Sequence, residues 1–119
     1  MKPTGPTNPL LKGLIQELRK KAQEQGANIW KRVADDLEKP ARQKRIVNLY
    51  KINKYTKENE TVIIPGKVLA VGDLDHNVTI AAFKFSGAAL DKINKVGKAI
   101  PINELIQEDP KGKRIRILG

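Results

Sequence analysis

The chain divides at the stretch Lys39–Lys57, whose sequence is KPARQKRIVNLYKINKYTK. This stretch contains seven Lys or Arg residues and no Asp or Glu, and apolar residues are interleaved with the basic ones. The sequence before it has helical periodicity, whereas the sequence after it has the signals of strands. We therefore interpret the stretch as a basic hinge between a helical portion and a strand-rich portion, with its charges outside and its apolar side chains anchored inside.

Two helices are predicted before the hinge. Asn8 and Pro9 form a helix start, with Asn as the N-cap and Pro at the first helical position, and Gly26 is suited to end that helix. The apolar residues of this helix recur at three- and four-residue spacing, as Leu11, Leu14, Ile15, Leu18 and Ala22. A second helix is expected from about Asn28 until Pro40, with an inner face of Ile29, Trp30, Val33, Ala34 and Leu37.

Short strands and helices are predicted after residue 45. Residues 47–50 fit a strand and residues 52–55 a helical turn. The runs 61–64 and 68–71 are strand-like, but Pro65-Gly66-Lys67 separates them. Because proline cannot donate to a strand ladder, we expect a corner or an edge there, not one long central strand. Residues 78–85 are apolar on both faces for most of their length, which predicts a strand covered on both sides.

The remaining elements are also short. A helix is expected after its cap Ser86 and before Gly97, with Ala89, Leu90, Ile93 and Val96 facing inward. A brief strand at 99–102, a helix capped by Asn103 and a last strand at 114–118 follow. The sequence thus predicts a single α/β domain over residues 1–119, in which an N-terminal helical portion precedes irregular strand-strand-helix turns. Residues 1–7 are expected to form a flexible basic arm.

The net charge of +10 is concentrated in the first half of the chain. Residues 1–57 carry 14 Lys or Arg against 5 Asp or Glu, whereas residues 58–119 carry 9 against 8. Such a split favours a nucleic acid or an anionic membrane surface as the partner. No apolar run approaches the roughly 18 residues of a membrane helix, and no signal peptide is evident. Cysteine is absent. We therefore expect a soluble, unexported protein with no membrane partner.

The sequence offers few residues for catalysis or metal binding. The only Ser and the only His, Ser86 and His76, flank the predicted strand and would lie about 30 Å apart along it. Asp73, Asp75 and His76 are possible metal ligands, but turn chemistry explains the Gly72-Asp73 pair without an ion. The sequence therefore predicts no catalytic residue, no metal, no cofactor and no small-molecule substrate.

Binding of folded RNA by shape and backbone is the favoured function, because phosphate neutralisation needs only Lys and Arg on a fixed surface. Aromatic residues make up 4% of the chain, fewer than base-stacking proteins usually show. Tyr50 and Tyr55 have two interpretations, which are amphipathic packing with a wet hydroxyl or contact with RNA. The predicted RNA-binding residues of the basic half are Lys2, Lys12, Lys31, Arg32, Lys39, Arg42, Lys44, Arg45, Lys51 and Lys54.

Two other functions stay open from the residues alone. One is a DNA-binding protein that uses the helices at 9–25 and 28–38, and the other is an adaptor whose basic face binds an acidic protein. Asp35, Asp36 and Glu38 lie near the end of the second helix, so a recognition helix there would meet phosphates with acids.

A set of motifs runs from Asn8 almost to Gly119. It comprises Asn8-Pro9, Ile29-Trp30, Val33-Ala34, Leu37, Lys39-Pro40, Arg42, Val47-Asn48-Leu49, Ile52, Tyr55, Thr61-Val62, Pro65-Gly66-Lys67-Val68-Leu69, Val78-Thr79, Ala81-Ala82, Phe85-Ser86, Gly97 and Pro110-Lys111-Gly112. With these motifs the chain resembles the archaeal and eukaryotic large-subunit ribosomal protein family eighteen-e, which is related in fold to the bacterial large-subunit ribosomal protein fifteen.

The resemblance implies a non-catalytic structural protein that binds large-subunit ribosomal RNA beside neighbouring ribosomal proteins. It implies an archaeal source, a cytoplasmic, ribosome-bound location, and an α/β fold behind N-terminal helices. It further implies that the corner at Gly66 and Lys67 faces RNA.

Overall fold

The structure is a computed structural model that describes residues 9–39, 45–109, 111–112 and 115–118. Its elements are α1 (Pro9–Gln25), α2 (Asn28–Leu37), β1 (Arg45–Asn48), α3 (Leu49–Tyr55), β2 (Glu60–Leu69), β3 (Val78–Phe85), α4 (Gly87–Val96), β4 (Lys98–Pro101), α5 (Ile102–Glu108) and β5 (Ile115–Ile117). The predicted fold class is confirmed, because a pair of helices precedes alternating strands and short helices. The basic arm predicted at 1–7 lies outside the described residues.

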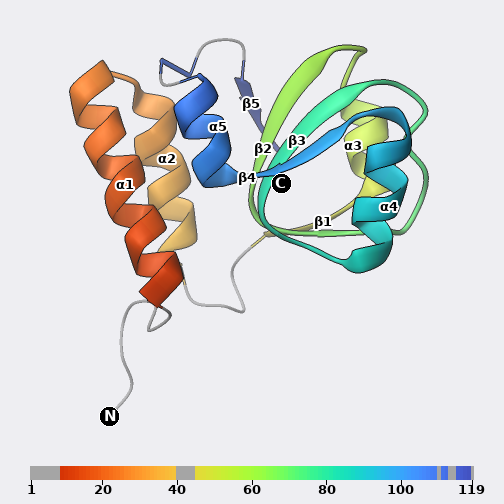
Figure 1. Ribbon diagram of the computed structural model, residues 1–119, viewed down its shortest axis with the longest axis horizontal. Coiled ribbons are helices and arrows are strands. Elements are labelled where there is room, and N and C mark those ends of the chain that lie inside the picture. Colours follow the sequence, from red (N-terminus) through yellow and green to blue (C-terminus); the bar gives the residue numbers. More distant parts are fainter. Residues whose placement is uncertain (1–8, 40–44, 110, 113–114, 119) are drawn as a thin grey trace.

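A parallel sheet separates two layers of helices. Its strand order is β1-β2-β3-β4, with β5 paired to β2 as well. Figure 1 shows α1, α2 and α5 on one side of the sheet and α3 and α4 on the other. β3 contributes to both cores, since Ala81 packs among the residues of α1, α2 and α5 and Ile80 packs with those of α3 and α4. The prediction that this strand is covered on both faces is confirmed.

The N-terminal helices form as their periodicity predicts. Leu11, Ile15 and Leu18 are buried on α1, and Gly26 ends that helix with φ of +62°, a conformation that favours glycine. The inner face of α2 is buried at four of its five predicted positions, including Trp30, and the fifth residue, Ile29, is partly buried. Within the described part of the chain, no helix is long and apolar enough to cross a membrane.

The expected corner at Pro65 is wrong, because β2 continues through it in the middle of the sheet. One flank of β2 pairs with β3, and the other pairs with β5 at residues 61–63 and with β1 at residues 66–69. Pro65 has no registered partner in any of these strands, and the register against β3 shifts between Ile64 and Lys67. A proline is tolerated in this central strand because its missing N–H falls where every neighbouring ladder is interrupted.

Two predicted boundaries are also wrong. Leu49 begins α3 instead of extending the strand, because its fully buried side chain packs with Ile52 at helical spacing. Asn103 is not the cap of the next helix, since α5 begins at Ile102 with Pro101 before it. Both helices begin early because burial of an apolar first residue adds to the helix face that meets the core.

The inner face of α4 is narrower than predicted. Ala89 and Ile93, four residues apart, are fully buried, and Ser86 accepts a hydrogen bond from the backbone N–H of Ala89 as the predicted cap. Leu90 and Val96, which were expected to face inward, are 37% and 38% exposed. This ten-residue helix contacts the sheet with one row of side chains, so the side chains on either side of that row lie at the border of the core.

Candidate nucleic-acid interface

The structure places the predicted RNA-binding residues on several elements. Five of them are exposed on helices or just after one, namely Lys12, Lys31, Arg32, Lys39 and Lys54. Lys51 is partly buried on α3. Lys2, Arg42, Lys44 and the side chain of Arg45 lie outside the described residues. The described cations of the predicted interface therefore lie on or beside the helices and on β2.

Some of the helical cations are paired with acids of the same helices. Lys31 Nζ lies 3.7 Å from Asp35 Oδ2, and Lys39 Nζ lies 3.1 Å from Asp36 Oδ1. Arg19 of α1 joins the two helices through ion pairs with Asp35 and Glu38 of the α2 end. These acids therefore partly neutralise Lys31 and Lys39, whereas Lys12 and Arg32 have no ion-pair partner among the described residues.

A second group of charges lies where β1, β2 and β3 end, which we call the carboxyl edge of the sheet. Lys67 of β2 is in register with Ile46 of β1 on one side and with Lys84 of β3 on the other. Both lysines are exposed, and Ile46 is 64% exposed. Because strands in a sheet are about 4.8 Å apart, the two lysine backbones are held as immediate neighbours.

The Lys67–Lys84 pair has no counter-charge in the described structure. No carboxylate of the described residues lies within 4 Å of either ammonium, and Lys84 Nζ lies 5.7 Å from the centroid of the Phe83 ring. Like charges directly opposite each other on neighbouring strands are destabilising. The carboxyl edge therefore carries two neighbouring lysines that no described carboxylate neutralises.

Sequence reasoning missed Lys84, whose signal was a single charge inside an otherwise apolar strand. Its importance comes from its register with Lys67, which lies seventeen residues away in the chain. Gly66, by contrast, was proposed as a contact and is buried, with its backbone paired to Arg45 of β1. Of the two residues predicted to face RNA at this position, Gly66 and Lys67, only Lys67 is therefore exposed to solvent.

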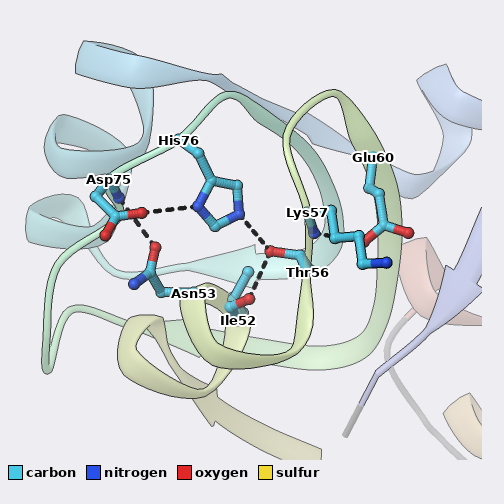
Figure 2. A network of polar contacts seen from close by, with 7 residues as sticks. All are labelled: Ile52, Asn53, Thr56, Lys57, Glu60, Asp75 and His76. Carbon is cyan, nitrogen blue, oxygen red and sulfur yellow. Dashed lines mark hydrogen bonds and ion pairs between the residues drawn. The ribbon is translucent and has the colours of Figure 1, made fainter.

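Two of the candidate residues, Asp75 and His76, take part in a structural network (Figure 2). His76 Nε2 lies 2.8 Å from Thr56 Oγ1, and His76 Nδ1 lies 2.8 Å from Asp75 Oδ1. The Thr56 hydroxyl donates to the carbonyl oxygen of Ile52 at 2.6 Å, and the backbone N–H of Asp75 donates to Asn53 Oδ1 at 3.0 Å. The network fastens the loop before β3 to the C-terminal end of α3.

This network engages both ring nitrogens of His76. Among the described residues, no group of three or more His, Asp or Glu side chains is placed to hold a metal ion. Ser86, the other candidate for chemistry, serves as the cap of α4. The contacts of His76 and Ser86 are those of side chains that stabilise the fold.

We predict that the contribution of Asp75 to stability depends on pH. Its hydrogen bond to the His76 ring, followed by that to Asn53, lowers the pKa of Asp75 below its ordinary value of 3.8. Because the pKa of Asp75 is lower in the folded state, the ionised carboxylate stabilises the folded protein at pH values above its unfolded-state pKa. This contribution is lost as the pH falls through the folded-state pKa. Asp75→Asn is therefore expected to lower the free energy of unfolding slightly at pH 7 and by less below pH 3.8, as measured by urea unfolding.

The control for this prediction is the same substitution in a His76→Ala background. If the ring causes the shift, the pH-dependent part of the Asp75→Asn effect shrinks in that background. An effect of equal size at both pH values in the wild-type background would contradict the prediction.

Comparisons with known proteins identify the family. No protein-family model matches the chain. The chain is, however, 48% identical to the large ribosomal subunit protein eL18 of Methanococcus maripaludis over 120 aligned positions, which cover 100% of both chains. It is 47% identical to eL18 of Methanothermobacter thermautotrophicus over 113 residues, which are 94% of this chain and 93% of the relative. Its identity to eL18 of Sulfurisphaera tokodaii is 47% over 116 residues, or 97% and 95% of the two chains. The resemblance inferred from the motifs is thus confirmed, and the chain belongs to the eL18 family of large ribosomal subunit proteins.

Proposed function

We propose that the chain is a non-catalytic structural protein of the large ribosomal subunit, where it binds folded ribosomal RNA through backbone phosphates. The shared identity of its archaeal relatives as large ribosomal subunit protein eL18 supports the assignment to this subunit. The phosphate mode rests on one observation, the Lys67–Lys84 pair at the carboxyl edge. These two like charges repel each other in the free protein, and a bound phosphate relieves the repulsion. The location that follows is the ribosome, in the cytoplasm beside other ribosomal proteins.

The sheet contributes rigidity to this contact. Both lysine backbones belong to strands inside the sheet, so only side-chain freedom is lost when a phosphate binds. Lysine acts on phosphate as a compact point charge, which positions the RNA backbone without reading its sequence. Arg32 and Lys12, exposed on the helices and without acidic partners in the described structure, extend the basic surface. This arrangement supports recognition of shape and backbone over recognition of bases in a duplex.

We predict a steep salt dependence of RNA binding. In a filter-binding series with a large-subunit ribosomal RNA transcript, log K is expected to fall linearly with log salt concentration, with a slope of about −0.7 to −0.9 for each phosphate contact. A flat dependence would contradict the proposal, since it would mean that no counterions are released.

Competition and sedimentation separate this function from its alternatives. A duplex DNA competitor of equal length is expected to compete poorly, because its groove geometry differs from that of folded RNA. Equal competition would favour the DNA-binding alternative. Co-sedimentation with large subunits at moderate salt is expected to be lost after nuclease treatment, whereas an adaptor bound to an acidic protein would stay associated.

A further inference from the structure

The carboxyl edge also carries exposed apolar side chains. Tyr50 and Val71 are 58% and 61% exposed, and each lies two residues beyond the end of its strand, β1 or β2. The backbone N–H of Tyr50 donates to the carbonyl oxygen of Val71 at 3.0 Å. This bond continues the pairing of β1 with β2 past the ends of both strands, and so it joins the two residues into one surface.

Two contacts hold this surface rigid. Gly72 has φ of +94°, and a Cβ at this position would come within 2.6 Å of Tyr50 Cβ, so the loop packs directly on the first turn of α3. Lys92 of α4 donates to the carbonyl oxygens of Ala70 and Gly72 at 3.0 and 2.8 Å. Its ammonium also lies 3.4 Å from Asp73 Oδ1. The loop that carries Val71 is therefore fixed to both α3 and α4. Tyr50 is thus held in place before any ligand binds.

The charges at the carboxyl edge indicate the kind of partner. Ile46 is in register with Lys67, which is in turn in register with Lys84. Ile46 lies four residues before Tyr50, at most about 13 Å of extended chain, and the two lysines lie one and two strand spacings of about 4.8 Å beyond Ile46. An anion on the lysines and a flat apolar group on the ring thus fit a ligand in which these two groups lie close together. A nucleotide has both, provided that its base is unpaired and its face is free to stack.

We propose that the carboxyl edge binds an unpaired nucleotide of ribosomal RNA, whose base stacks on Tyr50 while an adjoining phosphate lies against Lys67 and Lys84. This inference rests on the proposed function and adds to it a contact with a base. In the free protein the apolar face of the Tyr50 ring is exposed to water, which is unfavourable. Stacking of a base removes that face from water. Because loop and helix are already fixed, little further ordering opposes binding.

Tyr55, at the other end of α3, provides a natural control. It is 49% exposed, close to the exposure of Tyr50. However, Lys54 Nζ lies 5.4 Å from the centroid of its ring, and its carbonyl oxygen accepts a hydrogen bond from Arg116 at 2.7 Å. A contact within the chain therefore already engages the Tyr55 ring. Its partner Arg116 is in register with Val62, five residues before Lys67 along β2.

The test uses the full chain and a large-subunit ribosomal RNA transcript. Affinities are measured for the wild type and for Tyr50→Phe, Tyr50→Leu and Tyr55→Leu. Tyr50→Leu is expected to bind about 5- to 150-fold more weakly, the usual loss when one stacking ring is removed. Tyr50→Phe and Tyr55→Leu are expected to stay within about twofold of the wild type. Because none of these changes alters charge, the salt slope is expected to stay the same.

Cross-linking locates the contact independently of affinity. Ultraviolet irradiation of the wild-type complex, followed by mass spectrometry, is expected to find a nucleotide attached to the peptide that contains Tyr50. Normal RNA binding by Tyr50→Leu, with cross-links only at other peptides, would overturn the stacking inference and leave the proposed function intact. If Tyr50→Leu bound RNA normally but was incorporated poorly into subunits, the surface would belong to a protein neighbour, and the stacking inference would also be overturned. If the wild type itself showed no salt-dependent RNA binding, the proposed function would instead be refuted.

Discussion

Replacing Gly97 with alanine is expected to lower the free energy of unfolding by about 3 kcal/mol. Gly97 follows α4 and lies against the start of β3, where an added Cβ would come within 2.3 Å of the Val78 carbonyl oxygen and 2.9 Å of its nitrogen. Val78 is fully buried and in register with Glu60 of β2, so its backbone cannot retreat without breaking the sheet. The reason is close approach and not dihedral strain, since φ of Gly97 is −145°.

Gly13→Ala is the matched control for this prediction. Gly13 lies within α1, and nothing lies within 4 Å of the Cβ that alanine would add. Alanine there reduces the entropy of the unfolded chain and is expected to stabilise the protein by about 0.5–1 kcal/mol. Thermal and urea unfolding of both variants measure the difference. Equal effects of the two substitutions would contradict the close contact between Gly97 and β3.

The second large effect is expected from the double variant Lys67→Gln with Lys84→Gln. Glutamine keeps most of the side-chain length and removes both positive charges. We expect the affinity for large-subunit ribosomal RNA to fall roughly 10- to 100-fold, because two charge-assisted phosphate contacts are lost. The slope of log K against log salt is expected to become shallower by about 1.4 to 1.8, since two fewer counterion sites are released. Filter binding over a salt series measures both quantities.

The control variant removes the same net charge from lysines that have acidic partners. In Lys21→Gln with Lys98→Gln, the lost cations are those paired with Glu24 at 3.7 Å and Glu108 at 3.6 Å. This variant is expected to keep most of its RNA affinity. Stability gives a second criterion, because loss of the Lys67–Lys84 repulsion is expected to leave the thermal midpoint unchanged or slightly raised. A large loss of stability would show that these lysines support the fold instead of binding an anion.

Predictions from the sequence succeeded where the information is local. The stripe of Leu11, Ile15 and Leu18 marks the buried face of α1 because residues three and four apart share a helix face whatever surrounds them. The cap at Ser86 succeeded for the same reason, since its bond partner is only three residues away. Periodicity also failed locally where two patterns overlap, as at Leu49, which fits a strand by alternation and a helix by its spacing to Ile52.

The candidate interface was only partly predictable. Lys67 was identified through the family motif, but its partner Lys84 becomes meaningful only through the register of β2 with β3. Lys31 and Lys39 were predicted to bind RNA, and the structure pairs them with Asp35 and Asp36. Spacings of three and four residues on a helix could have signalled these pairs, because such residues are neighbours on its surface.

The sequence by itself determined the two N-terminal helices, the alternation of strands with short helices, the basic first half and the family. Each of these depends on composition or on residues a few positions apart. Only the tertiary structure decided that β2 passes through Pro65, that Gly97 lies against Val78, and that Lys67 stands beside Lys84 at the carboxyl edge. The physical reason is that these features depend on strand register, which joins residues distant in the chain through backbone hydrogen bonds that leave no local mark in the sequence.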